Sequence, residues 1–218
     1  LDNYHKAGYD HPILHAFEYE NDTLHLNFHR WGLIPGWIKS DEDAKSIWNK
    51  TLNARGETIF EKPSYKASGM HSRCIVPLDG YFEHHHIFNK TFPFYIHAKN
   101  EERLFVAGLT SKWNSPNGEL IATLAIVTSK ATLQLAEIHN NPAMKEARMP
   151  LILNDQEALT WLRTNDKEQL SELVKPNSYV QLDAHTVGPL SGKLYKGNDS
   201  QIIEERHYTE LDEPLTLF

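Results

Sequence analysis

Strand-like segments fill much of the chain before residue 130, and helix-like segments become frequent only after it. Residues 24–28 alternate apolar and polar side chains, which predicts a half-buried strand. Residues 73–83 predict a strand, a turn at Asp79-Gly80 and a second strand. Further strand-like runs cover residues 92–98, 103–109 and 120–129, and the last is apolar enough for a sheet core. This order predicts an α+β fold with a largely antiparallel, barrel-like twisted sheet flanked by helices.

Four segments carry the signals of helices. Residues 41–50 place acidic side chains in a first helical turn. The other predicted helices cover 130–139, with Leu133, Ala136 and Ile138 near one face, then 155–162, capped by Asp155, and a last one through Val174, capped by Asn165 or Asp166. No repeat or low-complexity linker divides the chain, so we expect residues 1–218 to form a single domain.

Composition excludes several classes of protein. The 218 residues include one cysteine, Cys74, which excludes a disulfide scaffold and a cysteine-rich zinc site. No run approaches the roughly 18 apolar residues of a membrane span, so we expect a soluble, cytoplasmic protein with no membrane partner. The net charge of -7 argues against a nucleic-acid partner, yet residues 30–90 carry nine Lys/Arg against seven Asp/Glu, a net of +2.

Three short constellations could carry chemistry. Arg55 lies two residues after Asn53 and could clamp a phosphate or carboxylate, although a surface ion pair with Glu57 explains it as well. Glu83 ends an apolar run, where partial desolvation suits a general acid or base. His139 ends a predicted helix and suits proton transfer, although a lone histidine is more often structural.

Three histidines follow Glu83 and raise the possibility of a metal site. On a strand, His84 and His86 share one face and His85 points the other way. Two ligands do not make a metal site, and no third ligand occurs at a suitable spacing. We therefore expect a solvated polar strand end, with no metal and no cofactor.

Together and in order, these pieces resemble the SRAP family, the SOS response-associated peptidases. Each motif is short, and the order of the whole series makes the resemblance specific. The motifs are Trp31-Gly32-Leu33-Ile34-Pro35 with Trp37, Asn53-Ala54-Arg55 with Glu57-Thr58, Arg73-Cys74 with Pro77 and Asp79-Gly80-Tyr81-Phe82-Glu83, Pro93-Phe94, Ala107-Gly108-Leu109, Ile126-Val127-Thr128, Ile138-His139 and Arg148-Met149-Pro150.

The resemblance implies a sensor of abasic sites in single-stranded DNA. In the family, an N-terminal cysteine forms a Schiff base and then a thiazolidine with the ring-opened sugar, and the same site is credited with removing the initiator Met. We accordingly expect an enzyme with lyase-like and thiol peptidase-like chemistry that acts as a monomer, near the nucleoid if the source is bacterial. Glu83, His139 and Asn53 would be catalytic. The DNA contacts implied are Arg55 to phosphate, Trp31 and Pro35 as an apolar surface, Thr128, and His84 where the family often has Trp.

Two departures from the family pattern qualify this prediction. The Met-Cys start of the family is absent, so the nucleophile is expected upstream of Leu1, since the internal Cys74 has no free α-amine. The spacing from His139 to Arg148 is longer than in compact members, through an insertion at residues 141–144. The alternatives are a peptidase or other hydrolase that acts on protein, a metal-dependent hydrolase built on His84 and His86, and a non-covalent single-stranded DNA-binding module.

Overall fold

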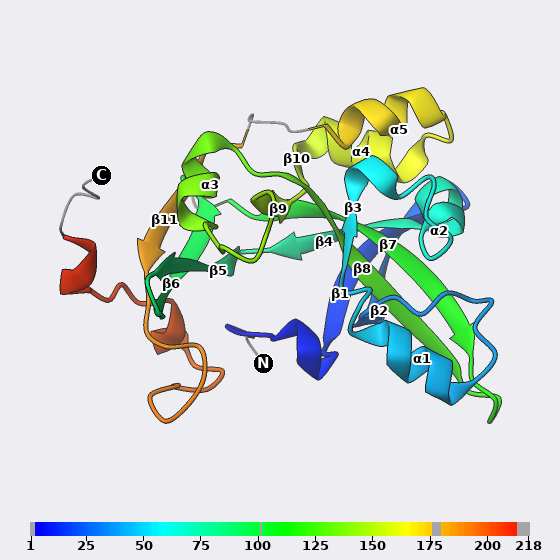
Figure 1. The fold of residues 1–218 in the computed structure, drawn as a ribbon. Coiled ribbons are helices and arrows are strands. Elements are labelled where there is room, and N and C mark those ends of the chain that lie inside the picture. The colour runs from blue at the N-terminus through cyan, green and yellow to red at the C-terminus, as the bar shows by residue number, and fades with distance from the viewer. Residues whose placement is uncertain (1–2, 101, 176–179, 213–218) are drawn as a thin grey trace.

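Five strands close into a barrel. The structure, a computed structural model, describes residues 3–100, 102–175 and 180–212, so Leu1 lies outside the described residues. The strands follow the order β7-β4-β1-β2-β8, and pairing between β7 and β8 closes the ring (Figure 1). All neighbours are antiparallel except β2 and β8. The five strands are β1 (Ile13–Glu20), β2 (Thr23–Trp31), β4 (Arg73–Leu78), β7 (Leu104–Asn114) and β8 (Leu120–Lys130).

Short strands extend the barrel, and a second sheet lies beside it (Figure 1). The extensions are β3 (Asn53–Arg55) and β9 (Arg148–Pro150), both on β8, and β10 (Ile152–Leu153) on β7. The second sheet has the order β11-β6-β5, with β5 (Gly80–Ile87), β6 (Lys90–Ala98) and β11 (Leu182–Thr186). The described α-helices are α1 (Asp41–Trp48), α2 (Lys66–His71), α3 (Leu133–Ile138), α4 (Asp155–Arg163) and α5 (Lys167–Leu173). Four short 3-10 helices are η1 (Gly8–Asp10), η2 (Gly56–Thr58), η3 (Ser200–Ile203) and η4 (Thr209–Leu211).

Buried side chains pack on both faces of the barrel sheet. Neighbouring residues of a strand point to opposite faces, so Cys74 and Ile75 on β4 belong to different clusters. The cluster on the Ile75 face includes Trp161 of α4 and Leu170 of α5, which cover that side of the sheet. No helix in the described part of the chain is long and apolar enough to cross a membrane.

The chain passes from the barrel to the second sheet at Asp79-Gly80, between β4 and β5. A Cβ atom at Gly80 would lie 2.6 Å from the carbonyl oxygen of Ile96 and 2.5 Å from the ring of Tyr95. Only glycine therefore allows β5 to pair this closely with β6. This close approach places Glu83, three residues further along, on the edge strand of the second sheet.

The fold class predicted from the sequence is confirmed, and some local predictions are wrong. The segment 24–28 is a strand, but Leu24, Leu26 and Phe28 are about half exposed, and the polar face with His29 is the buried one. In α3 the buried residue is Leu135, whereas Leu133 is 89% exposed. The cap of α4 is Asn154, one residue before the predicted Asp155, because its side chain accepts from the Glu157 backbone N–H.

A buried carboxylate explains the inversion of β2. Glu18 on β1 accepts hydrogen bonds from Asn27 Nδ2 (2.6 Å), His29 Nε2 (3.1 Å) and Thr110 Oγ1 (2.7 Å). Asn27 and His29 therefore face the same side as Glu18 and leave the apolar residues outside. Burial alone would raise the pKa of Glu18, but the three hydrogen bonds lower it from 4.5 to about 2. The carboxylate thus ties β1, β2 and β7 together.

This depressed pKa predicts how acid weakens the fold. The folded-state pKa lies below the unfolded value, so the contribution of Glu18 is present above about pH 4.5 and is lost as the pH falls through about 2. Glu18→Gln should lower the free energy of unfolding at neutral pH by roughly 2–3 kcal/mol, with the difference shrinking towards about pH 2. Urea unfolding across this range measures it, with Glu20→Gln, exposed on the same strand, as the control. An equal difference at neutral and acid pH would contradict this assignment.

Candidate functional site

Glu83 and His139 form a hydrogen-bonded pair. His139 Nδ1 lies 2.8 Å from Glu83 Oε2 and 2.8 Å from the carbonyl oxygen of Arg148. Both neighbours can only accept, so Nδ1 carries the hydrogen and donates it. The other carboxylate oxygen of Glu83 accepts the His84 backbone N–H at 2.8 Å. This arrangement fixes the tautomer of the imidazole and leaves Nε2 for chemistry.

The pair forms because the end of α3 docks on the edge of the second sheet. The side-chain amide of Asn140 accepts the His86 backbone N–H at 2.6 Å and donates to the His86 carbonyl at 2.9 Å, as a neighbouring strand would. One turn earlier, the carbonyl of Glu137 accepts from Nδ1 of the buried His85 at 2.9 Å. These bonds hold the segment after α3 against β5, where His139 meets Glu83.

Glu83 alters the acidity of its partner. The hydrogen bond from His139 to Glu83 raises the pKa of His139 above 6.5, against an opposing effect of burial. The side chain of His139 is 13% exposed and that of Glu83 is 23% exposed, so solvent screens the pair only partly. The raised pKa favours the doubly protonated form of the imidazole. A carboxylate beside a protonated imidazole can accept one proton and deliver another.

Arg148, whose carbonyl bonds to His139, also makes a network of bonds with its side chain. Its guanidinium donates to both carboxylate oxygens of Glu57 (2.7 and 2.8 Å) and to the Thr128 carbonyl (2.7 Å). Burial alone would raise the pKa of Glu57, but the bonds from Arg148 lower it. Because Glu57 pairs with Arg148, the ion pair between Arg55 and Glu57 that the sequence left open is not the bond formed. Arg55 itself is exposed and lies opposite Thr128 in the β3–β8 pairing.

The other predicted catalytic and binding residues lie around this framework. Asn53 is exposed on β3, and its carbonyl accepts the Tyr65 hydroxyl at 3.1 Å. Within the described residues, no hydrogen bond joins Asn53 to Glu83 or His139. His84 is half-buried next to Glu83, and burial lowers its pKa. Thr128 is half-buried, with its carbonyl engaged by Arg148.

Trp31 and Pro35, the residues predicted to form an apolar surface, are less exposed than the nearby Trp37. Trp31 is half-buried and donates its indole N–H to the Leu52 carbonyl at 2.9 Å. Pro35 is buried in a loop that packs on Trp113 through Ile34 and Ile38, and the Trp113 indole donates to the Ile38 carbonyl, while the predicted DNA contact of Pro35 stays a prediction. Trp37, 55% exposed, is the aromatic side chain that this loop presents to solvent.

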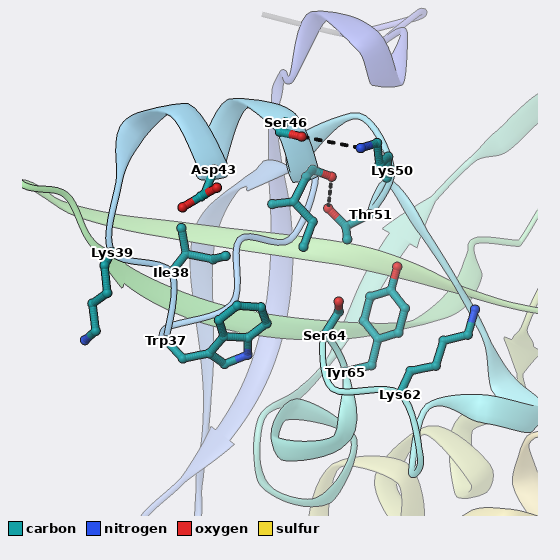
Figure 2. A pocket seen from close by; sticks show the side chains of 11 residues that line it. Trp37, Ile38, Lys39, Asp43, Ser46, Lys50, Thr51, Lys62, Ser64 and Tyr65 are labelled. Atoms are coloured by element: carbon teal, nitrogen blue, oxygen red, sulfur yellow. Dashed lines mark hydrogen bonds between the residues drawn. The ribbon is translucent and has the colours of Figure 1, made fainter.

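Trp37 borders an open pocket of about 660 Å³ between α1 and the segment from Lys62 to Tyr65 (Figure 2). Figure 2 shows Trp37 and Lys39 on one side and Lys50 and Lys62 on the other. The charged lining is three lysines against Asp43, so the pocket is basic in an acidic protein. Sequence analysis missed it, although the basic excess of residues 30–90 was the signal. The Tyr65 hydroxyl, which bonds to Asn53, connects the pocket to β3.

Two other candidates receive no support. Among the described residues, no group of three or more His, Cys, Asp or Glu side chains is arranged to hold a metal ion, so nothing completes a site at His84 and His86. Cys74 is fully buried, and burial raises the pKa of its thiol well above the usual value. A buried protonated thiol is a poor nucleophile.

Comparisons with known proteins show which family and which solved fold this chain resembles. The protein family described as SOS response associated peptidase (SRAP) matches residues 3–193. The abasic site processing protein YoqW of Bacillus subtilis is 35% identical over 178 residues, which cover 80% of this chain and 74% of YoqW. The abasic site processing protein HMCES of Mus musculus is 29% identical over 191 residues, 74% of this chain and 51% of HMCES. A crystal structure of a protein from Bacteroides thetaiotaomicron shares the fold with a TM-score of 0.83 at 34% identity, covering 95% of this chain and 87% of that one.

The Glu83–His139 bond predicts a measurable change in acidity. In Glu83→Gln the pKa of His139 should fall, because the raising effect of the carboxylate is lost while burial still lowers it. An NMR titration of the His139 Cε1–H resonance measures the change. Glu137→Gln, on the same helix turn but outside the pair, serves as the control and should leave the titration unchanged. An unchanged titration in Glu83→Gln would show that Glu83 does not set the acidity of His139.

Proposed function

The chain belongs to the SOS response-associated peptidase (SRAP) family, and on that premise we propose that it recognises abasic sites in single-stranded DNA and bonds to them covalently. The observation that carries the proposal is the Glu83–His139 pair, which Arg148 links to Thr128, the residue opposite Arg55 in the β3–β8 pairing. Relatives at up to 35% identity are abasic site processing proteins, which supports DNA as the substrate. This function requires a compartment that holds DNA, in a bacterium the cytoplasm.

The chemistry proposed is amine attack on an aldehyde. The nucleophile is the α-amine of an N-terminal cysteine upstream of Leu1. The amine adds to the C1 aldehyde of the open sugar, the resulting carbinolamine loses water to give an imine, and the thiol adds across the C=N bond to close a thiazolidine. The sequence of steps needs no oxidant or metal, only proton transfers.

The pair distributes these proton transfers. Glu83, as a carboxylate, accepts a proton from the α-ammonium group, and the neutral amine that results attacks the aldehyde. His139 delivers a proton from Nε2 to the sugar ring oxygen as it opens and to the departing water, since Nδ1 is bonded to Glu83 and the Arg148 carbonyl. The raised pKa of His139 supports the acid role. Asn53 is proposed to orient the lesion by hydrogen bonding from its exposed amide.

The proposed DNA path runs over the basic pocket. Arg55 is exposed on β3, where its planar fork can bind one phosphate with two hydrogen bonds. Lys39, Lys50 and Lys62 can neutralise further phosphates, while Trp37 offers a ring for base stacking. Local positive charge explains how a protein with a net charge of -7 could bind a polyanion.

The decisive experiment is adduct formation. A version of the protein that begins Met-Cys ahead of this chain, incubated with single-stranded DNA that contains one abasic site, should give an adduct that survives denaturation. Glu83→Gln should slow adduct formation by about 10²-fold or more, the usual size of a lost general base, while Glu61→Gln, an exposed substitution of the same kind, should not. DNA binding without any adduct would favour the non-covalent module, and cleavage of unrelated peptides would favour the hydrolase.

The pocket yields a second prediction. Trp37→Ala should weaken binding of single-stranded DNA by roughly tenfold, because stacking one base contributes about 1–3 kcal/mol. Fluorescence anisotropy at fixed salt measures the dissociation constant. Leu159→Ala on α4, an exposed apolar residue far along the chain, should leave it unchanged. Equal affinities for the three proteins would exclude the pocket from the DNA path.

A further inference from the structure

The loop between α3 and β9 places a methionine on the reactive nitrogen of His139. Met144 Sδ lies 3.1 Å from His139 Nε2. Nε2 is the only ring nitrogen not bonded to Glu83 and the Arg148 carbonyl. Met144 itself is 38% exposed, so its outer side faces solvent while its sulfur covers the imidazole. The atom that our mechanism uses as the acid is therefore covered in this structure.

The loop has bonds that support this placement. Asn141 turns the chain, since its side-chain oxygen accepts the Ala143 N–H at 2.9 Å and its carbonyl accepts the Met144 N–H at 3.0 Å. Further along, Glu146 pairs with Lys130 of β8 at 2.8 Å. Both ends of the loop are thus held, and Met144 lies between them. The loop includes residues 141–144, the segment that makes the spacing from His139 to Arg148 long.

The thioether of Met144 has the chemical properties of a group that can cover His139 Nε2 and also move away from it. A Met side chain excludes water from Nε2. Because sulfur accepts hydrogen bonds weakly, it holds Nε2 less tightly than a carboxylate or a carbonyl would. The side chain is unbranched and has three rotatable bonds, so it can swing aside without moving the loop backbone. The loop backbone is therefore held in place, while the Met144 side chain can rotate away from His139.

We propose that Met144 is a gate on His139: its side chain shields Nε2 in the free protein and must swing away when the abasic sugar enters. The inference rests on the proposed function for the identity of the substrate, but the shielding itself does not depend on it. Met144 is a positioning residue, because it controls access to the acid and does not itself exchange a proton.

Shielding can be tested on the free protein. Diethyl pyrocarbonate acylates unprotonated imidazole nitrogens, and peptide mass spectrometry locates the modified histidine. Met144→Ala should speed modification of His139 by about fivefold, equivalent to ~1 kcal/mol less protection. Met144→Leu keeps the volume and should stay close to the wild-type rate. Leu133→Ala, an exposed apolar truncation on neighbouring α3, is the matched control and should also stay at that rate. No acceleration in Met144→Ala, or equal acceleration in Leu133→Ala, overturns the gate.

Displacement can be tested with DNA. The chain has three methionines, Met70, Met144 and Met149, so ¹³C-methyl labelling gives three NMR signals. Titration with single-stranded DNA that carries a stable abasic analogue should shift the Met144 methyl signal, while that of Met70, on α2, stays in place. Binding seen by anisotropy with no shift of Met144 overturns the gate. Absence of any DNA binding would refute the proposed function instead, and the acylation rates alone would then decide whether Met144 shields His139.

Discussion

The hydrogen bond from His139 Nδ1 to Glu83 is the contact on which the candidate site depends. One N–H shared between a carboxylate and the Arg148 carbonyl fixes the plane of the imidazole and leaves Nε2 facing Met144 Sδ, and the bond to Glu83 raises the pKa of His139. The Asn140 amide bonds to both backbone groups of His86, as a neighbouring strand would, and so helps to hold His139 beside Glu83.

The barrel supplies the rigid base for this contact. Along the second half of β8, the strands β3 and β9 take over from β2 and β7 as pairing partners, and they bring Arg55 and Arg148 to the same end. The two arginines then divide their roles. Arg148 is buried and donates from its two terminal nitrogens to Glu57 and Thr128, whereas Arg55 is exposed. A functional group held on a strand is placed more accurately than one on a free loop.

Charge and burial explain where prediction from sequence succeeded and failed. The order of the segments predicted the fold class, and short motifs singled out Glu83 and His139 as candidates, which the structure brings into one hydrogen-bonded pair. Alternation in β2 was interpreted with the wrong face buried, since it cannot reveal that Glu18 and Thr110 hold the polar side chains inside. The burial of Pro35 likewise does not follow from its motif, because a loop motif carries no information about what packs over it.

The sequence by itself determined the α+β class and supplied candidate residues for the site, because hydrophobic periodicity, turn residues and short motifs are local properties. Only the tertiary structure decided which of these residues meet. Glu83 and His139 are more than fifty positions apart along the chain, and Met144 reaches His139 across a loop whose turn depends on Asn141. Such contacts depend on how sheet and helix dock, which follows from packing and burial over the whole chain and not from any one segment.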